Sequence, residues 1–158
     1  MKVLVVGGAG YIGSHVVLSA LEKGFEVTIF DNLSTGSKIN INKNAKFVKG
    51  SINSSSDLKK LFKKEKYGGL IHLAASKASG ESMVNPLKYA KNNIMGGMNL
   101  LSKSIKYGIK KFVFSSSAAV YGSPQYIPID EKHQLEPSNY YGYTKLFIER
   151  NLEWFSKL

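Results

Sequence analysis

The 158 residues are enough for one domain with a hydrophobic core, and 43% hydrophobic residues is ordinary for a globular protein. The chain contains no cysteine, which excludes disulfides and thiolate metal sites and favours a cytoplasmic location, and no apolar run is long enough to cross a membrane. The net charge of +11 comes mostly from lysines, many of them between residues 59 and 66 with the spacing of a solvated helix face and without interleaved aromatic residues, so we expect no nucleic-acid partner.

Short apolar runs alternate with stretches of helical spacing along the whole chain. Strands are predicted over Lys2–Val6, Glu26–Phe30, Lys46–Lys49, Leu70–Leu73 and Lys111–Ser116. Helices are predicted over Ile12–Lys23, Ser56–Glu65, Pro86–Tyr107 and Tyr140–Lys157. This alternation predicts an α/β fold, a doubly wound parallel sheet with helices on both faces. The segment 121–139 holds three of the four prolines and is long for a loop in a compact domain, which favours a binding or lid role.

The turn between the first strand and the first helix reads GGAGYIG. It matches G-x-G-x-x-G at Gly8, Gly10 and Gly13, and G-x-x-G-x-x-G at Gly7, Gly10 and Gly13. Glycine tolerates the unusual dihedral angles of a tight turn and lets a phosphate group approach the backbone. The helix that follows offers free N–H groups and a partial positive charge. A glycine-rich turn in this position predicts a dinucleotide-binding loop.

Asp31 ends the second predicted strand, 18 residues after Gly13. This is close to the spacing expected for an acidic residue that binds the adenosine ribose of a dinucleotide. A carboxylate at that position accepts hydrogen bonds from the ribose hydroxyls and repels a 2′-phosphate. The sequence therefore favours NAD over NADP.

A Tyr-x-x-x-Lys pattern, which places two side chains one helical turn apart, occurs twice. The pair Tyr107 and Lys111 straddles Gly108, where a helix should end, so the two side chains would not share a face. The pair Tyr141 and Lys145 lies in the first turns of the last predicted helix and is the candidate pair. The serine-rich run FSSSAAVYG, residues 114–122, follows the fifth predicted strand, at the end of a parallel sheet where ligands bind. A serine that holds a substrate oxygen, and a tyrosine base whose phenolate a lysine favours, would form a redox site.

These motifs together resemble the extended short-chain dehydrogenase/reductase family of NAD-dependent epimerases and dehydratases. The stretches that carry the resemblance are GGAGYIGSH, DNLSTG (31–36), HLAASKASGES (72–82), NPLKYAKNNI (85–94), FSSSAAVYG and YYGYTK (140–145). They follow one another in family order over the whole chain. The resemblance implies a Rossmann-like fold, NAD as cofactor and a UDP-sugar substrate. The three histidines, His15, His72 and His133, show no ligand spacing, so we expect no metal site.

The resemblance also implies which residues bind and react. Those assigned to NAD are Gly7, Gly10, Tyr11, Ile12 and Gly13 at the pyrophosphate, Asp31 and Asn32 at the ribose, Ser51 and Ile52 on the adenine side, Leu73, Ala74, Ala75 and Lys77 in the cofactor cleft, and Asn92 nearby. The catalytic set is Ser117, Tyr141 and Lys145, of which the last two also contact the cofactor. Ser51 departs from the family, which usually has an aspartate there.

Within the family, two features favour sugar-nucleotide 4-epimerases that interconvert UDP-glucose and UDP-galactose. Ala118 and Ala119 stand where 4,6-dehydratases carry an acidic pair, and Lys77 matches the galactose-type enzymes. The implied reaction passes through a 4-keto sugar, with transient hydride transfer to NAD. The alternatives are another NAD-dependent sugar-nucleotide epimerase, or a non-catalytic NAD-binding or interaction module.

Family members continue for about as many residues again beyond the last motif of this chain. We therefore expect residues 1–158 to form an incomplete NAD-binding domain, without the last strands and the substrate domain, and to be weakly active or inactive alone. The long helices predicted over 86–107 and 140–157 correspond to a pair that forms dimers in this family, which implies a homodimer.

Overall fold

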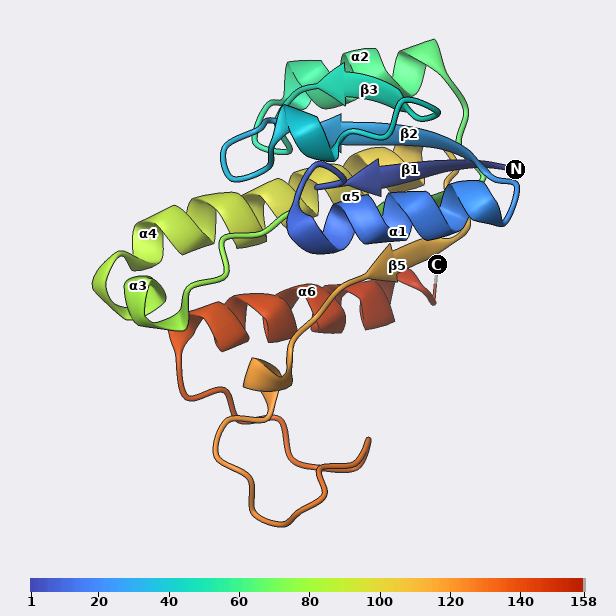
Figure 1. Cartoon of the computed structure of the whole chain (residues 1–158). Helices are drawn as coiled ribbons and strands as arrows, with labels where there is room; N and C mark the ends of the chain where they lie inside the picture. Colours follow the sequence, from blue (N-terminus) through green and yellow to red (C-terminus); the bar gives the residue numbers. More distant parts are fainter. Residues whose placement is uncertain (158) are drawn as a thin grey trace. The chain divides into compact units, whose positions relative to one another are not determined.

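The computed structural model describes residues 1–157 and divides into two compact units (Figure 1). The first, here called the sheet unit, consists of Met1–Ala75 and Asn99–Ser115. The second, the helical unit, consists of Ser76–Met98 and Ser116–Leu158. Each unit is therefore built from two separate segments of the chain.

The sheet unit contains one parallel sheet of five strands in the order β3-β2-β1-β4-β5. The strands are β1 (Lys2–Val6), β2 (Glu26–Asp31), β3 (Lys46–Lys49), β4 (Gly69–His72) and β5 (Phe112–Phe114). In register, Val5 of the central strand lies opposite Ile29 on one side and Ile71 on the other. All five predicted strands are confirmed; β5 is shorter than predicted because its ladder with β4 spans only three residue pairs.

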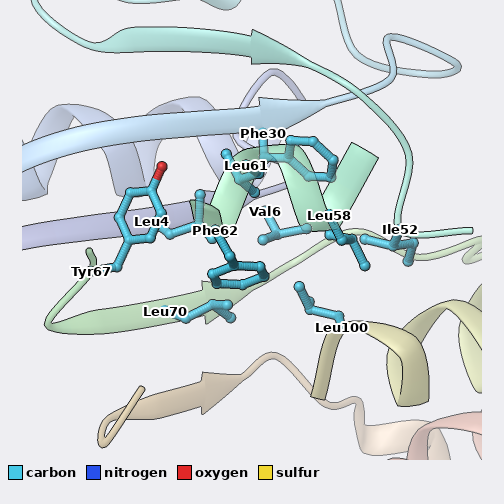
Figure 2. Packing of buried hydrophobic residues seen from close by; sticks show 10 residues of the cluster. All are labelled: Leu4, Val6, Phe30, Ile52, Leu58, Leu61, Phe62, Tyr67, Leu70 and Leu100. Atoms are coloured by element: carbon cyan, nitrogen blue, oxygen red, sulfur yellow. The ribbon is translucent and has the colours of Figure 1, made fainter. Parts of the chain in front are cut away.

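Two hydrophobic cores lie on opposite faces of this sheet. Leu4 and Val6 point into one core, which α2 (Ser55–Lys64) and Leu100 of α5 (Gly96–Lys106) cover (Figure 2). Val3 and Val5 alternate with them and point to the other core, which α1 (Tyr11–Glu22) covers. Because side chains alternate along a strand, a sheet covered on both faces needs continuous apolar strands such as VLVV. The predicted doubly wound α/β fold is confirmed.

The lysine-rich helix α2 has the solvated face that its sequence predicts. Leu58, Leu61 and Phe62 are buried against the sheet, whereas the lysines at positions 59, 60, 63 and 64 are exposed. Ser54 caps its first turn by accepting a hydrogen bond from the Asp57 N–H at 3.2 Å. A short 3-10 turn, η1 (Lys38–Asn40), lies in the polar segment before β3.

The helix predicted over Pro86–Tyr107 is present without a break from Pro86 to Lys106, but it is not α-helical throughout. The segment consists of α4 (Pro86–Tyr89), a π-helical turn η2 (Ala90–Met95) and α5. The buried Asn93 lies in the π turn, and its side-chain amide bonds to Ser76 and Thr144, outside the helix. Such π turns are frequent at functional sites. A further helix, α3 (Ser79–Val84), was not predicted because six residues carry too little periodicity.

The helical unit is organised around the last helix, α6 (Tyr140–Phe155), against which α3, α4, η2 and the 3-10 turn η3 (Ala118–Val120) pack. Asn139 caps α6 by accepting a hydrogen bond from the Gly142 N–H at 2.9 Å. A side chain at Gly142 would collide with the carbonyl oxygen of Ala119, so only glycine allows η3 to lie this close to the first turn of α6.

Candidate functional site

The glycine loop leaves β1 through a turn that excludes side chains. Gly7 has φ +86°, a region that favours glycine, and its N–H donates to the Phe30 carbonyl at 2.9 Å. A Cβ on Gly7 would lie 2.7 Å from the backbone nitrogen of Ala74. A Cβ on Gly13 would collide with the carbonyl oxygen of Gly7. These two glycines therefore let α1 start directly against the ends of β1 and β4.

The N-terminus of α1 forms the face of this loop that can bind an anion. Gly10 is the N-cap and supplies no side-chain cap, and the first helical hydrogen bond is that of Ser14 N–H to the Gly10 carbonyl at 2.9 Å. The N–H groups of Tyr11, Ile12 and Gly13 therefore have no acceptor within the helix. A Cβ on Gly10 would approach only the Gly7 oxygen, at 3.4 Å. This open N-terminus, with no acidic residue in its first turn, suits a phosphate group.

Asp31 ties the end of β2 to the glycine loop. Its side chain is 8% exposed; Oδ2 accepts a hydrogen bond from Ala9 N–H at 3.0 Å, and Oδ1 accepts one from Leu33 N–H at 2.8 Å. Each carboxylate oxygen has a second lone pair, so both can still accept a hydrogen bond from a ligand. The neighbouring Asn32 accepts from Ser34 N–H at 2.9 Å and is exposed.

The other cofactor residues predicted in the sheet unit follow β3 and β4. The N–H groups of Leu73 and Ala74 both donate to the Val6 carbonyl, at 2.8 and 3.1 Å, and Ala75 follows them. The Ser51 N–H donates to a carboxylate oxygen of Asp57 at 3.2 Å. Ile52 is buried, and its carbonyl accepts from Asn99 Nδ2 at 2.7 Å. The glycine loop, Asp31, Ser51 and Leu73 thus all lie at the carboxyl ends of parallel strands, where open α/β sheets bind ligands.

Tyr141 and Lys145 lie one turn apart on α6, as predicted from their spacing. The Lys145 side chain is 4% exposed, and its Nζ lies 5.9 Å from the centroid of the Tyr141 ring. Burial lowers the pKa of Lys145 to about 8, against the opposing effect of the Glu149 carboxylate. An ammonium group held this close to a tyrosine can stabilise its phenolate form.

Buried polar side chains fix the backbone of Tyr141, and sequence reasoning did not identify them. Ser82 Oγ accepts a hydrogen bond from Tyr141 N–H at 3.0 Å, and Thr144 Oγ1 donates to the Tyr141 carbonyl at 2.7 Å. Asn93 Nδ2 donates to Thr144 Oγ1 at 3.0 Å, while its Oδ1 accepts from Ser76 N–H at 2.8 Å. The sequence signal for them was that Ser82, Asn93 and Thr144 lie in the quoted stretches. Their burial is a tertiary property.

Three further residues predicted to belong to the site lie in the helical unit, namely Ser117, Asn92 and Lys77. Ser117 begins η3, and its Oγ accepts from Ala119 N–H at 3.2 Å. Since Ala119 packs on Gly142, the Ser117 turn adjoins the first turn of α6. Asn92 lies in the π turn and donates to Ser76 Oγ at 3.3 Å, and Lys77 is exposed.

The other Tyr-x-x-x-Lys pair, Tyr107 and Lys111, does not form a site. Tyr107 stacks on Phe62 with ring centroids 5.5 Å apart, and Lys111 is exposed beyond the end of α5. Within residues 1–157, no three His, Asp or Glu side chains are grouped so that they could hold a metal ion. No helix of the described residues is both long and apolar enough to cross a membrane.

The doubly wound sheet and its glycine loop define a dinucleotide-binding α/β protein. The chain belongs to the NAD dependent epimerase/dehydratase family, whose profile matches residues 3–158. It is 44% identical to the UDP-glucose 4-epimerase of Lacticaseibacillus casei, over 98% of this chain and 46% of that enzyme. It is 45% identical to a bifunctional UDP-glucose 4-epimerase and UDP-xylose 4-epimerase of Pisum sativum, over 94% of this chain and 45% of that enzyme.

Solved structures give the same result. The UDP-glucose 4-epimerase of Brucella ovis in complex with NAD superposes with a TM-score of 0.95 at 39% identity, covering 99% of this chain and 48% of that one. The Thermotoga maritima enzyme with UDP-glucose has a TM-score of 0.95 at 42% identity, covering 99% of this chain and 52% of that one. The chain therefore spans about half the length of the relatives that it matches.

Proposed function

We propose that this chain is the NAD-binding and catalytic part of a UDP-sugar 4-epimerase, with UDP-glucose and UDP-galactose as the substrate pair. The observation that carries the proposal is the buried Lys145 against the Tyr141 ring, on a helix whose first turn is fixed by buried hydrogen bonds. Burying a lysine costs stability, and lysines with a perturbed pKa cluster at functional sites. Here the side chain would be placed to stabilise a phenolate at Tyr141. The names of the similar proteins support the same activity.

The sheet unit has the groups that NAD binding requires. The open N-terminus of α1 and Gly10 would hold the pyrophosphate, and Asp31 would accept hydrogen bonds from the adenosine ribose. Tyr11, Ile12, Asn32, Ser51, Ile52, Leu73, Ala74, Ala75, Lys77 and Asn92 would complete the contacts with the cofactor. The buried and already hydrogen-bonded carboxylate of Asp31 has a fixed orientation, which favours discrimination against a 2′-phosphate.

Bound NAD would supply the acceptor and later the donor of the hydride at C4 of the sugar. Tyr141 would accept the proton of the C4 hydroxyl through its phenolate oxygen as the C4 hydride leaves, which gives a 4-keto sugar. Ser117 would donate a hydrogen bond to the same sugar oxygen, and the Lys145 ammonium would stabilise the phenolate. Tyr141 would return the proton to the sugar oxygen as the hydride is delivered to the opposite face of C4, so that both the tyrosine and the cofactor would end each cycle in their starting states.

The relatives that share this activity by name are about twice as long. We therefore expect these 158 residues to bind NAD and to convert UDP-galactose slowly or not at all. Because turnover is expected to be weak, cofactor binding is the primary test.

The test is calorimetric titration of the chain with NAD and with NADP. NAD is expected to bind at least about tenfold more tightly, since a hydrogen bond to a charged group contributes about 1.5–3 kcal/mol. Asp31→Asn should weaken NAD binding and reduce the ratio of the affinities for NAD and NADP. Glu22→Gln removes an exposed charge at the other end of α1 and should leave both the affinity for NAD and this ratio unchanged. Equal affinity for the two dinucleotides, or no binding of either, would contradict the proposal.

The catalytic assignment of Tyr141 is tested with the protein at the same concentration as UDP-galactose, so that a single slow turnover can be detected. Tyr141→Phe should bind NAD with the affinity of the wild type. It should not convert UDP-galactose, and addition of UDP-galactose should not produce the absorbance of reduced nicotinamide. Conversion at the wild-type rate by Tyr141→Phe would favour a non-catalytic role for this pair.

A further inference from the structure

The loop 121–139 joins the turn that carries Ser117 to the helix that carries Tyr141, and it is closed at its base. Gly122 has φ +66°, and a side chain there would collide with the carbonyl oxygen of Glu136. Just outside the loop, Ala119 before it packs on Gly142 after it. The two ends of the loop therefore lie side by side, as in a compact loop that packs on its own side chains.

His133 is the buried centre of this loop. Its side chain is 4% exposed, and the rings of Tyr126 and Tyr121 contact it with centroids 4.7 and 5.6 Å away. The backbone N–H of Gln125, eight residues earlier, donates to Nε2 at 3.0 Å. Nδ1 lies 3.0 Å from the carbonyl oxygen of Gln134. The imidazole thus connects the first half of the loop, through Gln125, with its second half, through Gln134.

These two contacts determine the protonation state of the ring in the closed loop. A backbone N–H can only donate, so Nε2 must offer its lone pair. The ring proton is then on Nδ1, which donates to the Gln134 carbonyl. An imidazolium would have N–H groups at both positions, and the one on Nε2 would face the Gln125 N–H. The closed loop therefore accommodates the neutral ring and not the charged one.

We propose that His133 is a pH-sensitive latch that closes the loop 121–139 when its imidazole is neutral and releases it when the imidazole is protonated. Since the loop runs from Ser117 to Tyr141, its release would loosen the connection between the two parts of the helical unit that hold these side chains. The latch itself does not depend on the proposed enzymatic function.

The other titratable groups around the ring keep their charge over the range in which histidine titrates, about pH 5 to 8. A hydrogen bond from the Tyr126 hydroxyl, 2.7 Å long, lowers the pKa of the Asp130 carboxyl, and the same bond raises the pKa of Tyr126. Asp130 therefore stays ionised and Tyr126 stays neutral. The charge of Asp130 is therefore constant over this range, and Asp130 cannot restore the acceptor that the Gln125 N–H loses. The remaining charged groups of the loop, Glu131, Lys132 and Glu136, are exposed.

Hydrogen exchange of the 158-residue chain tests the latch without any ligand. Protection factors, which correct for the intrinsic pH dependence of exchange, are compared at about pH 5 and about pH 8. The Gln125 amide and the loop should lose at least about tenfold in protection at the lower pH, because a buried N–H loses its acceptor. The amides of β1 and α6 should change far less.

Three variants separate the latch from general acid sensitivity. His133→Gln retains a side-chain acceptor that cannot titrate, so its loop protection should be the same at both pH values. His133→Phe fills the space without an acceptor and should be unprotected at both. His15→Gln replaces an exposed histidine of α1 and should behave as the wild type. If His133→Phe does not fold, the wild type and His133→Gln still decide the question: equal pH dependence in these two, or none in the wild type, would overturn the proposal.

Discussion

Gly13 is the position of the glycine loop at which a side chain is least tolerable. Because a Cβ there would collide with the Gly7 carbonyl, Gly13→Ala must displace the turn from the start of α1. We predict a loss of about 1–3 kcal/mol in the free energy of unfolding, the usual effect of overpacking, together with weaker NAD binding. Urea denaturation and calorimetry measure the two effects.

Gly80 provides the matched control for this substitution. It lies in α3 with no atom within 4 Å of an added Cβ, so Gly80→Ala should change stability by less than about 1 kcal/mol and should favour the helix. Equal losses in the two variants would mean that the collision at Gly13 is relieved without disturbing the loop.

Lys145 couples the site to the stability of the fold through pH. In the unfolded chain its pKa has the ordinary value of 10.5, and burial in the folded chain lowers the pKa to about 8. Between these values the unfolded state binds more protons, so the contribution of Lys145 to stability rises as pH increases from 8 to 10.5 and is lost as pH falls through 8. Its full extent is on the order of 3 kcal/mol.

The variant Lys145→Met removes this titration while filling a similar volume. The free energies of unfolding of wild type and Lys145→Met are measured by urea denaturation. As pH increases from 8 to 10.5, the wild type should become more stable relative to Lys145→Met. Lys91→Met, at an exposed position of the π turn, should show a nearly constant difference. A constant difference for Lys145→Met as well would show that the buried amine does not titrate in this range.

At the scale of elements, periodic segments were predictable and tertiary adjustments were not. The strand VLVV is readable as a short continuous apolar run, and the helix with Leu58, Leu61 and Phe62 as a helical spacing of apolar residues; both are confirmed. The π turn at Ala90–Met95 has no such period, because it depends on where the Asn93 amide finds its partners. A π turn inside a continuous helix is therefore not readable from the spacing of apolar residues along the chain.

The same division applies to the candidate site. The glycine loop, Asp31 and the Tyr141–Lys145 pair could be found from the sequence, because each depends on spacing along one strand or helix. The hydrogen bond from Asn93 to Thr144 joins residues 51 apart, and that from Tyr141 to Ser82 joins residues 59 apart. A polar residue becomes recognisable as a support of Tyr141 only when the fold brings such pairs together.

For the whole molecule, we predict self-association through the helical unit, as the family resemblance of its long helices implies. This unit exposes large apolar side chains on α3, α4, η2 and α6, namely Met83, Val84, Leu87, Met95 and Trp154. Scattered exposed apolar residues are common, whereas a contiguous apolar patch marks an interface, and we predict that these side chains contribute to one. Leu87 is 81% exposed and Trp154 is 70% exposed.

Sedimentation equilibrium of the double variant Leu87→Lys and Trp154→Lys tests this prediction. Its dimer should dissociate at least about tenfold more readily than that of the wild type, because aromatic anchors dominate interfaces. Ile39→Lys is the control, since Ile39 is 90% exposed but lies in the sheet unit. A monomeric wild type, or an equal effect of Ile39→Lys, would contradict the assignment.

The way the chain divides between the two units has a consequence for its synthesis. The polypeptide passes from one unit to the other three times, and the segment 76–98 of the helical unit is made before β5 of the sheet unit. As the chain leaves the ribosome, β1 to β4 emerge first and β4 can pair with β1. Its second neighbour, β5, is made some 40 residues later, since Leu70 pairs with Phe112. Neither unit is a continuous stretch of the gene, so no single cut separates them intact, and the two must mature as one nascent chain.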